Sequence, residues 1–228
     1  MSLPPSSSPA FIGTDKFLVG LAGRGILQSR TPWMHEQEGD AQGLRLLYAL
    51  FDFTDRGWSD DQLPALLEAA QRLGLAGLNI TFPFKQAVIG LLDELDPSAA
   101  SVGAVNTVSF RDGRRIGSNT DMTGFAQGFR TGMPWADLGR VLQVGCGGAG
   151  AATAHALLGL IGVEQLVLCD TDATRAGRLR DQLAAAHGAT RVTLADDPAR
   201  AASGCSGIVN ATPMGMAKFP GMPLPAEA

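Results

Sequence analysis

The chain has 228 residues, of which 45% are hydrophobic and 18% charged, a composition that predicts a globular protein of one large or two small domains. The net charge of −4 gives no electrostatic support to a nucleic-acid or anionic-membrane partner, and no apolar run approaches the length of a membrane span. The three cysteines, Cys146, Cys169 and Cys205, show no CxxC spacing, which argues against a disulfide framework or a zinc site and favours a reducing cytoplasm.

Residues 1–16 are expected to form a disordered tail, and residues 1–9 lack the basic start and apolar middle of a signal peptide. Strand-like apolar runs over 17–23, 46–53 and 77–81 then alternate with helix-length segments. The helices are expected to open at Pro32, to cover 60–73, and to run from Pro83 to about Leu95. This order predicts a parallel sheet with helices on its faces, followed by a hairpin that turns at residues 111–114.

A second alternation begins at residue 140. Strands are expected over 140–146, over 165–170, near Val192 and from Gly207, with helices between them up to about Ile161 and over 174–186. The sequence therefore predicts an α/β protein of two domains, joined near 121–139. The first domain is expected over 17–122, and a Rossmann-like dinucleotide-binding domain over 123–228.

The segment Gly145-Cys146-Gly147-Gly148-Ala149-Gly150 joins a predicted strand to a predicted helix and is a variant of the GxGxxG pattern. Glycines there let the backbone turn tightly and approach a pyrophosphate, whose charge is stabilised by N–H groups at the helix N-terminus. A tight turn required only by packing is the alternative. Residues Gly145, Cys146, Gly147, Gly148 and Ala149 are therefore candidates for cofactor binding.

Asp170 ends the next predicted strand, at the distance along the chain where an acid meets the adenosine ribose hydroxyls. A carboxylate in that place repels a 2′-phosphate, which favours NAD over NADP. Arg175 leaves the choice open, because an arginine five residues later can hold a phosphate or can simply be a solvated residue of a helix. NAD is the expected cofactor, and NADP remains an alternative.

Six motifs follow one another over residues 20–216. They are Ser29-Arg30-Thr31-Pro32 with His35, Asn79-Ile80-Thr81-Phe82-Pro83-Phe84-Lys85, Gly103-Ala104-Val105-Asn106-Thr107, Gly117-Ser118-Asn119-Thr120-Asp121, the loop at Gly145, and Asn210-Ala211-Thr212-Pro213-Met214-Gly215-Met216. Together they resemble the shikimate and quinate dehydrogenase family. The resemblance implies a substrate domain first, a Rossmann-like cofactor domain second, and a site in the cleft between them.

The resemblance assigns the chemistry to Lys85 and Asp121. Oxidation of an alcohol needs a base for the hydroxyl proton while a hydride leaves to the nicotinamide, and the reverse reaction needs an acid. A lysine partly withdrawn from water can shift its pKa toward neutrality, whereas an adjacent carboxylate favours the ammonium form. We therefore assign Asp121 to orienting Lys85 and binding the reacting hydroxyl, and leave the proton route open. A surface salt bridge is the alternative.

The implied substrate is shikimate or quinate, a hydroxylated ring with one carboxylate, oxidised to 3-dehydroshikimate or 3-dehydroquinate. Ser29 and Thr31 would bind the carboxylate near a helix N-terminus, with N-capping as their alternative role. Thr81 and Asn106 would bind ring hydroxyls unless they only satisfy local backbone. Thr212 and Met214, in the last motif, would line the nicotinamide side of the site. The alternative is that this motif is only a turn enforced by Pro213 and Gly215. Thr31 and Asp170 together resemble the branch that also oxidises quinate with NAD.

The family continues well past the motif that ends at Met216, and its later part supplies a glutamine and a tyrosine near the substrate. This chain ends twelve residues after Met216, so we expect a fragment that binds substrate weakly. Competing hypotheses are a dehydrogenase of a related cyclic hydroxy acid and a non-catalytic, cofactor-binding regulatory module. We expect a monomer or homodimer without a metal, because His35, His155 and His187 have no ligand partner in the sequence pattern.

Overall fold

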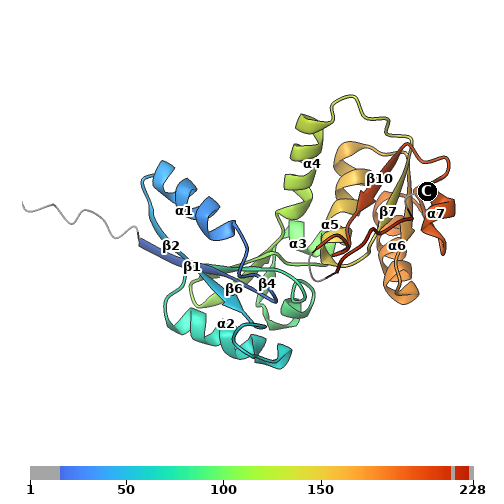
Figure 1. Cartoon of the computed structure of the whole chain (residues 1–228). Helices are drawn as coiled ribbons and strands as arrows, with labels where there is room; N and C mark the ends of the chain where they lie inside the picture. The colour runs from blue at the N-terminus through green and yellow to red at the C-terminus, as the bar shows by residue number, and fades with distance from the viewer. Residues whose placement is uncertain (1–15, 217–218, 226–228) are drawn as a thin grey trace, which may run out of the picture.

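The computed structural model describes residues 16–216 and 219–225. The tail expected over 1–16 lies outside the described residues, apart from Lys16, which begins the first strand. Two β-sheets organise the chain, the first over residues 16–118 and the second over 140–210 (Figure 1). The expected α/β architecture is confirmed, while the boundary between the domains stays a prediction.

The first sheet has six strands in the order β2-β1-β3-β5-β6-β4. Strands β2, β1 and β3 are parallel, and β5 and β6 form the expected antiparallel hairpin, which turns at Asp112 and Gly113 with φ of 51° and 75°. The sheet is therefore mixed. Its strands are β1 (Lys16–Gly23), β2 (Arg45–Asp52), β3 (Gly77–Ile80), β4 (Glu94–Leu95), β5 (Thr107–Arg111) and β6 (Arg114–Ser118).

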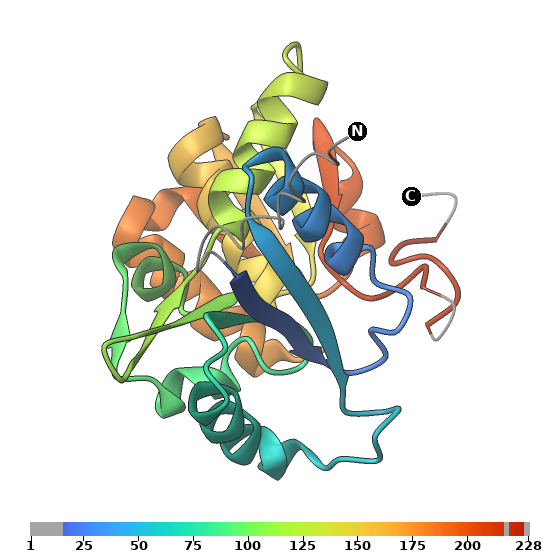
Figure 2. The ribbon, with the colours of Figure 1, turned by 90° about the vertical axis from the view of Figure 1, so that its left-hand side faces the viewer.

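Helices cover both faces of this sheet. Figures 1 and 2 show α1 (Thr31–Ala41) on one face and α2 (Leu63–Arg72) on the other, the latter preceded by a short 3₁₀ turn, η1 (Asp60–Gln62). The buried face of α2 carries Leu66 and Leu67, which pack against Leu78 and Ile80 of β3. This spacing of apolar residues is that of an amphipathic helix, so burial of one stripe fixes α2 on the sheet.

The prediction of a helix over 83–95 is wrong. Residues after β3 form turns, then a 3₁₀ helix, η2 (Ala87–Leu91), then β4, and the Phe82–Pro83 peptide is cis. The backbone carbonyl of Lys85 accepts a hydrogen bond from the Val105 N–H at 2.8 Å, outside any helix. A tertiary hydrogen bond thus replaces the helical one that the local pattern suggested.

The second sheet has four parallel strands in the order β10-β7-β8-β9. The strands are β7 (Arg140–Val144), β8 (Gln165–Cys169), β9 (Val192–Leu194) and β10 (Gly207–Asn210). Residues alternate between two apolar layers, as expected of parallel strands buried on both faces. The helices are α4 (Asp121–Gly132), α5 (Gly148–His155) with its π-helical extension η3 (Ala156–Ile161), α6 (Ala173–His187), η4 (Ala189–Arg191) and α7 (Pro198–Ala202).

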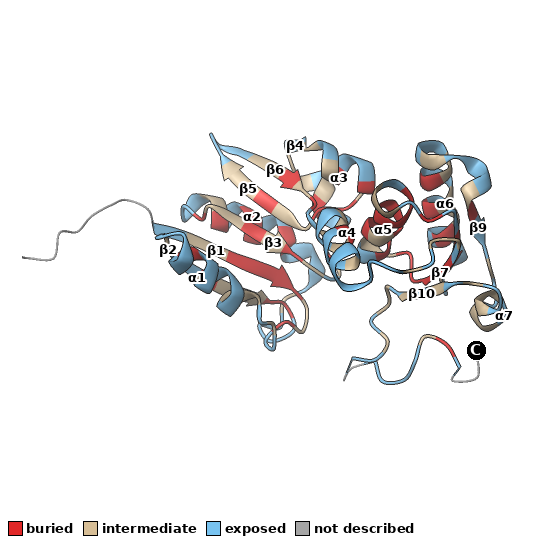
Figure 3. Ribbon diagram, turned by 90° about the horizontal axis from the view of Figure 1, so that it is seen from above, coloured by how far each residue is buried: buried red, intermediate tan, exposed pale blue. Residues whose placement is uncertain are grey.

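Two residues of the first domain belong to an apolar core of the second domain. Val102 is the last residue of α3 (Pro97–Val102) and Ala104 comes two residues later, so both belong to the first domain. Both nevertheless pack within the core cluster to which α5, α6 and β8 contribute. Met122 and Phe125 of α4 pack against the same cluster. Figure 3 shows the buried residues running along α5 and α6 on the side that faces this core. The segment expected only to join the domains is therefore a helix packed on the second one.

Candidate functional site

Three of the predicted site residues lie at one edge of the first sheet. Thr81 directly follows β3 and Asp121 follows β6 by three residues, while Asn106 immediately precedes β5, which runs the opposite way. The Ile80 N–H donates to the Asn106 carbonyl at 2.8 Å, which fixes two of these segments side by side. Polar side chains from distant segments therefore converge at the carboxyl ends of parallel strands, where sheets of this kind bind ligands.

Lys85 and Asp121 form an ion pair at this edge. Lys85 Nζ lies 2.5 Å from Asp121 Oδ2, and the two side chains are 18% and 31% exposed. The pair is half-buried, unlike the fully solvated surface pair that the sequence left as an alternative. The structure thus brings together the two residues that the motifs singled out.

Asn106 and Asn119 hold Asp121 from two sides. Asn106 Nδ2 donates to Asp121 Oδ1 at 2.8 Å and to Thr120 Oγ1 at 2.9 Å. The buried Asn119 accepts the Asp121 backbone N–H on Oδ1 at 2.9 Å and donates from Nδ2 to the Ala104 carbonyl at 2.8 Å. Asn119 was not among the predicted site residues, although it lies within a quoted motif, because its contribution depends on a carbonyl fifteen residues away.

Ser29 and Thr31 lie at the start of α1, with their hydroxyl oxygens 2.7 Å apart. Ser29 Oγ also accepts the Thr31 backbone N–H at 3.2 Å. The capping position belongs to Arg30, and neither hydroxyl makes the side-chain cap that the sequence allowed as an alternative. Two hydroxyl groups side by side at a helix N-terminus suit a carboxylate ligand.

Asp52 anchors the loop that leads to Ser29 and was missed in the sequence. Its carboxylate accepts backbone N–H bonds from Gly25 at 2.8 Å and Ile26 at 2.6 Å. Burial alone would raise the pKa of Asp52, but bonds from Gly25, Thr54 and Ile26 outweigh it and hold that pKa below its ordinary value. An aspartate at the end of a predicted apolar strand is the signal that was available for it.

The glycine loop between β7 and α5 uses three glycines in three ways. Gly145 has φ of 104°, a left-handed conformation that favours glycine. A Cβ on Gly150 would lie 2.2 Å from the Gly145 carbonyl oxygen, so only glycine permits this approach. A Cβ on Gly147, by contrast, would meet no atom of the described residues within 4 Å. This division of roles fits a loop that leaves Gly147 open to a dinucleotide pyrophosphate at the N-terminus of α5.

The glycine loop also contacts Lys85 of the Lys85–Asp121 pair. A Cβ built on Gly148 would lie 3.0 Å from Lys85 Cβ, so the lysine stem packs directly on this loop. On the other side, a Cβ on Gly145 would lie 2.9 Å from Thr212 Cγ2, just after β10. Met214 donates its backbone N–H to Thr212 Oγ1 at 3.1 Å. The predicted lysine, loop and Thr212–Met214 segment therefore form one continuous region.

Asp170 and Arg175 are paired with each other. Arg175 donates from Nη2 to Asp170 Oδ1 at 2.9 Å and from Nε to Oδ2 at 3.2 Å, and the Cys146 and Asp172 N–H groups occupy the remaining positions. Burial, which leaves this carboxylate 7% exposed, would raise the Asp170 pKa, but these bonds outweigh it and lower that pKa. Arg175 is exposed in the first turn of α6, as the sequence allowed, and its guanidinium is also paired with Asp170.

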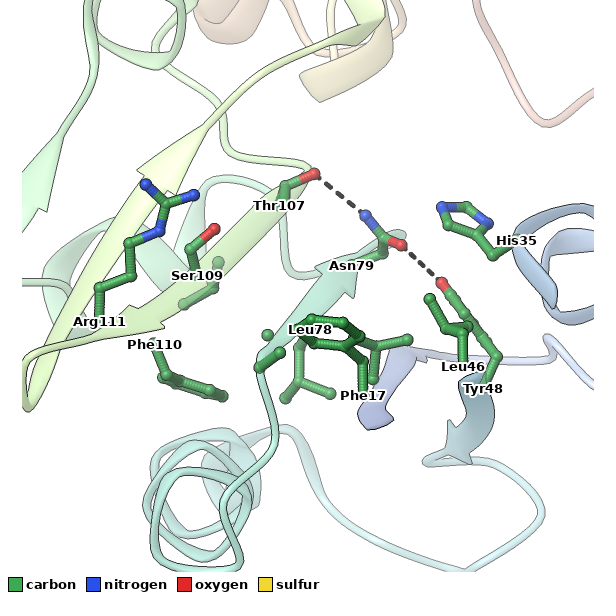
Figure 4. Close-up of a pocket in the computed structure, with 14 residues that line it drawn as sticks. Phe17, His35, Leu46, Tyr48, Leu78, Asn79, Thr107, Ser109, Phe110 and Arg111 are labelled. Atoms are coloured by element: carbon green, nitrogen blue, oxygen red, sulfur yellow. Dashed lines mark hydrogen bonds between the residues drawn. The ribbon is translucent and has the colours of Figure 1, made fainter. Parts of the chain in front are cut away.

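Three further observations concern the described residues. Within residues 16–216 and 219–225, no group of three or more His, Cys, Asp or Glu residues is arranged to hold a metal ion. No helix among the described residues is both long and apolar enough to span a membrane. A groove of about 470 Å³ runs along the α1 side of the first sheet, and Asn79, Thr107 and Tyr48 line it next to the Asn106 edge (Figure 4).

Known proteins resemble this chain over most of its length. Residues 21–108 match the family model described as the shikimate dehydrogenase substrate binding domain. A shikimate dehydrogenase (NADP(+)) of Pseudarthrobacter chlorophenolicus is 48% identical over 217 residues, which are 94% of this chain and 73% of the relative. A quinate/shikimate dehydrogenase (NAD(+)) of Corynebacterium efficiens is 49% identical over 211 residues, 91% of this chain and 74% of the relative.

Solved structures agree with the sequence relatives. Quinate dehydrogenase from Corynebacterium glutamicum in complex with NAD superposes with a TM-score of 0.80 at 45% identity, covering 92% of this chain and 76% of that one. Shikimate 5-dehydrogenase from Thermus thermophilus in complex with NADP(H) and shikimate gives a TM-score of 0.77 at 31% identity, covering 92% and 74%. The chain belongs to the shikimate/quinate dehydrogenase family.

Proposed function

We propose that the protein is a shikimate/quinate dehydrogenase that transfers a hydride reversibly between a ring hydroxyl of shikimate or quinate and NAD or NADP. The observation that carries this proposal is the Lys85–Asp121 pair, 2.5 Å apart, packed against the Gly148 loop. A proton-handling group and a dinucleotide loop in direct contact are what alcohol oxidation requires.

The nicotinamide, when bound, accepts or supplies the hydride. Lys85 Nζ is the group proposed to take the hydroxyl proton during oxidation and to return it during reduction. Asp121 orients the ammonium through Oδ2, and its Oδ1 is held by Asn106 Nδ2. Because both Asp121 oxygens are engaged, the carboxylate stays fixed beside the reacting hydroxyl, and alignment of this kind contributes strongly to rate.

The substrate carboxylate is assigned to Ser29 and Thr31, and the ring hydroxyls to Thr81 and Asn106. Support comes from their placement: all four follow or precede strands at the same edge of the first sheet as the catalytic pair. Hydroxyl and amide groups there can donate hydrogen bonds to the oxygen atoms of the substrate.

The cofactor residues fit a dinucleotide. The open face of Gly147 leaves room for the pyrophosphate, and Asp170 lies at the end of β8, where a carboxylate would meet the adenosine ribose. Arg175 now occupies that carboxylate in a two-pronged pair, so ribose binding requires the guanidinium to move. A displaced Arg175 beside the ribose also suits a 2′-phosphate, and we propose NAD as the preferred cofactor with NADP accepted.

A panel assay tests the proposal. Reduced-nicotinamide absorbance is followed with quinate and with shikimate, each with NAD and with NADP, alongside other cyclic hydroxy acids as controls. We expect the full-length protein to turn over quinate or shikimate, with higher kcat/KM for NAD than for NADP. Turnover of only a different cyclic hydroxy acid would move the assignment to the competing dehydrogenase. Cofactor binding without any turnover would instead favour the regulatory module.

A further inference from the structure

A row of hydrogen bonds crosses the first sheet and ends at the site. Tyr48 OH donates to Asn79 Oδ1 at 2.6 Å, and Asn79 Nδ2 donates to Thr107 Oγ1 at 3.0 Å (Figure 4). Thr107 Oγ1 in turn donates to Asn106 Oδ1 at 2.9 Å. The members of the row lie on three strands, Tyr48 on β2, Asn79 on β3 and Thr107 on β5, and the row passes over β1, which lies between β2 and β3. None of its first three members touches Lys85 or Asp121.

The row has a direction. A tyrosine hydroxyl carries one hydrogen, so its bond to Asn79 Oδ1 turns the Asn79 amino group toward Thr107. Thr107 Oγ1 then accepts from Asn79 and directs its own hydrogen to Asn106 Oδ1. The Asn106 amino group is left facing Asp121 Oδ1 at 2.8 Å. A flipped Asn106 would instead set its carbonyl oxygen against the Asp121 carboxylate, and the two acceptors would repel each other.

The start of the row is rigid. Tyr48 is buried among Leu21 and Ile26, and its ring lies 4.8 Å from the ring of His35 on α1. Its backbone N–H donates to Glu36 Oε1 at 2.9 Å, which ties β2 to α1. Burial raises the pKa of Tyr48, so the hydroxyl stays protonated and remains a donor at neutral pH.

We propose that Tyr48, Asn79 and Thr107 are positioning residues that fix the Asn106 carboxamide with its amino group toward Asp121, and through Asp121 keep Lys85 aligned. Thr107 is the decisive link, because its hydroxyl contacts Asn106 directly. The Thr120 N–H also donates to Asn106 Oδ1 at 3.2 Å, so loss of Thr107 weakens the orientation without abolishing it. The effect on turnover rests on the proposed function.

Two variants and one control measure the effect on turnover. Thr107→Val keeps the side-chain shape without a donor, and we expect kcat/KM for quinate or shikimate to fall about fivefold, the factor that one neutral hydrogen bond supplies. Thr107→Ser keeps the hydroxyl and should restore kcat/KM to within twofold of the parent. Ser109→Ala changes the next residue on the same strand face, which makes no side-chain hydrogen bond to any residue described, and should match the parent.

A double-mutant cycle tests whether the upstream residue acts through Thr107. Tyr48→Phe alone should lower kcat/KM about twofold, and adding it to Thr107→Val should cost nothing further, since the link is already cut. Additive losses would overturn the proposed row. Equal losses in Thr107→Val and Thr107→Ser, or parental kcat/KM in Thr107→Val, would remove Thr107 from its role. Unfolding temperatures measured in parallel separate these effects from a general loss of stability.

A readout that does not depend on turnover distinguishes failure of this inference from failure of the proposed function. In ¹⁵N-labelled protein the Asn106 side-chain amide signals are identified by their loss in Asn106→Ala. We expect them to shift and to exchange faster with water in Thr107→Val, and to remain in place in Thr107→Ser and Ser109→Ala. Unchanged Asn106 signals in Thr107→Val would contradict the inference even if the enzyme were active. If the parent turns over neither substrate, these signals alone decide it.

Discussion

The ammonium group of Lys85 is placed by contacts along its whole length. Its stem packs on the glycine loop at Gly148, and its Nζ meets Asp121, which Asn106 and Asn119 hold in turn. A group that transfers a proton must stay within reach of the reacting hydroxyl, and an extended chain of contacts restricts it far more than one ion pair would. Loss of the ammonium alone, with the stem still packed against Gly148, should therefore be enough to impair the reaction.

The Lys85→Met variant tests this view, because it keeps the stem against Gly148 and removes only the ammonium. We expect kcat for quinate or shikimate to fall by about 10²–10⁴, the range that positioned acid–base groups contribute, while the dissociation constant for NAD stays within about threefold of the parent. Absorbance kinetics and calorimetric titration with NAD measure the two quantities. Gln86→Ala, at the exposed neighbouring position, is the control and should keep parental kcat. Unchanged kcat in Lys85→Met would exclude the lysine from the chemistry.

At the scale of elements, two glycines of the strand–loop–helix unit β7–α5 have different expected roles. Gly150 is expected to be needed for folding and Gly147 for binding the cofactor. A Cβ on Gly150 would collide with the Gly145 carbonyl, whereas one on Gly147 would stand in open space at φ of −73°. We expect Gly150→Ala to lower the free energy of unfolding by about 2 kcal/mol or more, since a backbone atom cannot give way. Gly147→Ala should leave it unchanged but weaken NAD binding about tenfold or more.

Denaturant unfolding and NAD titration on the same two proteins provide the measurement. Parental NAD affinity in Gly147→Ala would mean that the pyrophosphate does not approach the loop at this residue. Parental stability in Gly150→Ala would show that the loop and helix can separate by several tenths of an ångström without cost. Each variant thus serves as the control for the other.

The sequence predicted those elements whose signals are local. Apolar runs located the strands of both sheets except β4, and the GxGxxG variant located the turn into α5. The prediction was wrong at 83–95, where the Lys85 carbonyl accepts a hydrogen bond from the Val105 N–H. It also missed α4, because the three glycines of this helix lower its helix propensity. Packing of Met122 and Phe125 against the second domain stabilises α4 nevertheless. The decisive information in both places came from residues distant in the chain.

The same contrast between local signals and distant contacts applies to the residues of the site. Motifs predicted Lys85, Asp121 and the glycine loop, because each has a characteristic pattern of residues. The links that hold them were not predictable, since Tyr48 and Asn79 meet only through a sheet register that sets Tyr48 beside Val19 and Asn79 beside Leu21. Likewise, the pairing of Arg175 with Asp170 depends on side-chain direction at the end of β8.

For the whole molecule, packing between the domains fixes the catalytic pair relative to the dinucleotide loop. Val102 and Ala104 of the first domain complete the core of the second, and the Lys85 stem touches Gly148. Loss of structure in the second domain therefore removes both the loop and the apolar support of the first domain's edge. Conditions that destabilise the second domain should abolish activity even where the first sheet remains folded.

Acid is such a condition, because a buried histidine pair joins α5 to α6. His155 is 4% exposed, its Nδ1 lies 3.2 Å from His187 Nε2, and its own Nε2 has no hydrogen-bond partner among the described residues. Burial, and secondarily the charge of His187, lower the pKa of His155 from 6.5 to about 4. The unfolded chain therefore binds more protons than the folded one between these values, and stability falls as pH drops from about 6.5 toward 4.

We expect the free energy of unfolding to be constant above pH 7 and to lose roughly 2–3 kcal/mol by pH 4 through this residue. Circular dichroism during denaturant titrations at pH 7.5, 6, 5 and 4.5 measures the loss. His155→Leu removes the group with the strongly lowered pKa together with its unpaired Nε2, so the stability of this variant should depend less steeply on pH. A parent whose stability does not change between pH 7 and 4.5, or a His155→Leu protein that loses as much as the parent, would show that protonation of this pair does not control the second domain.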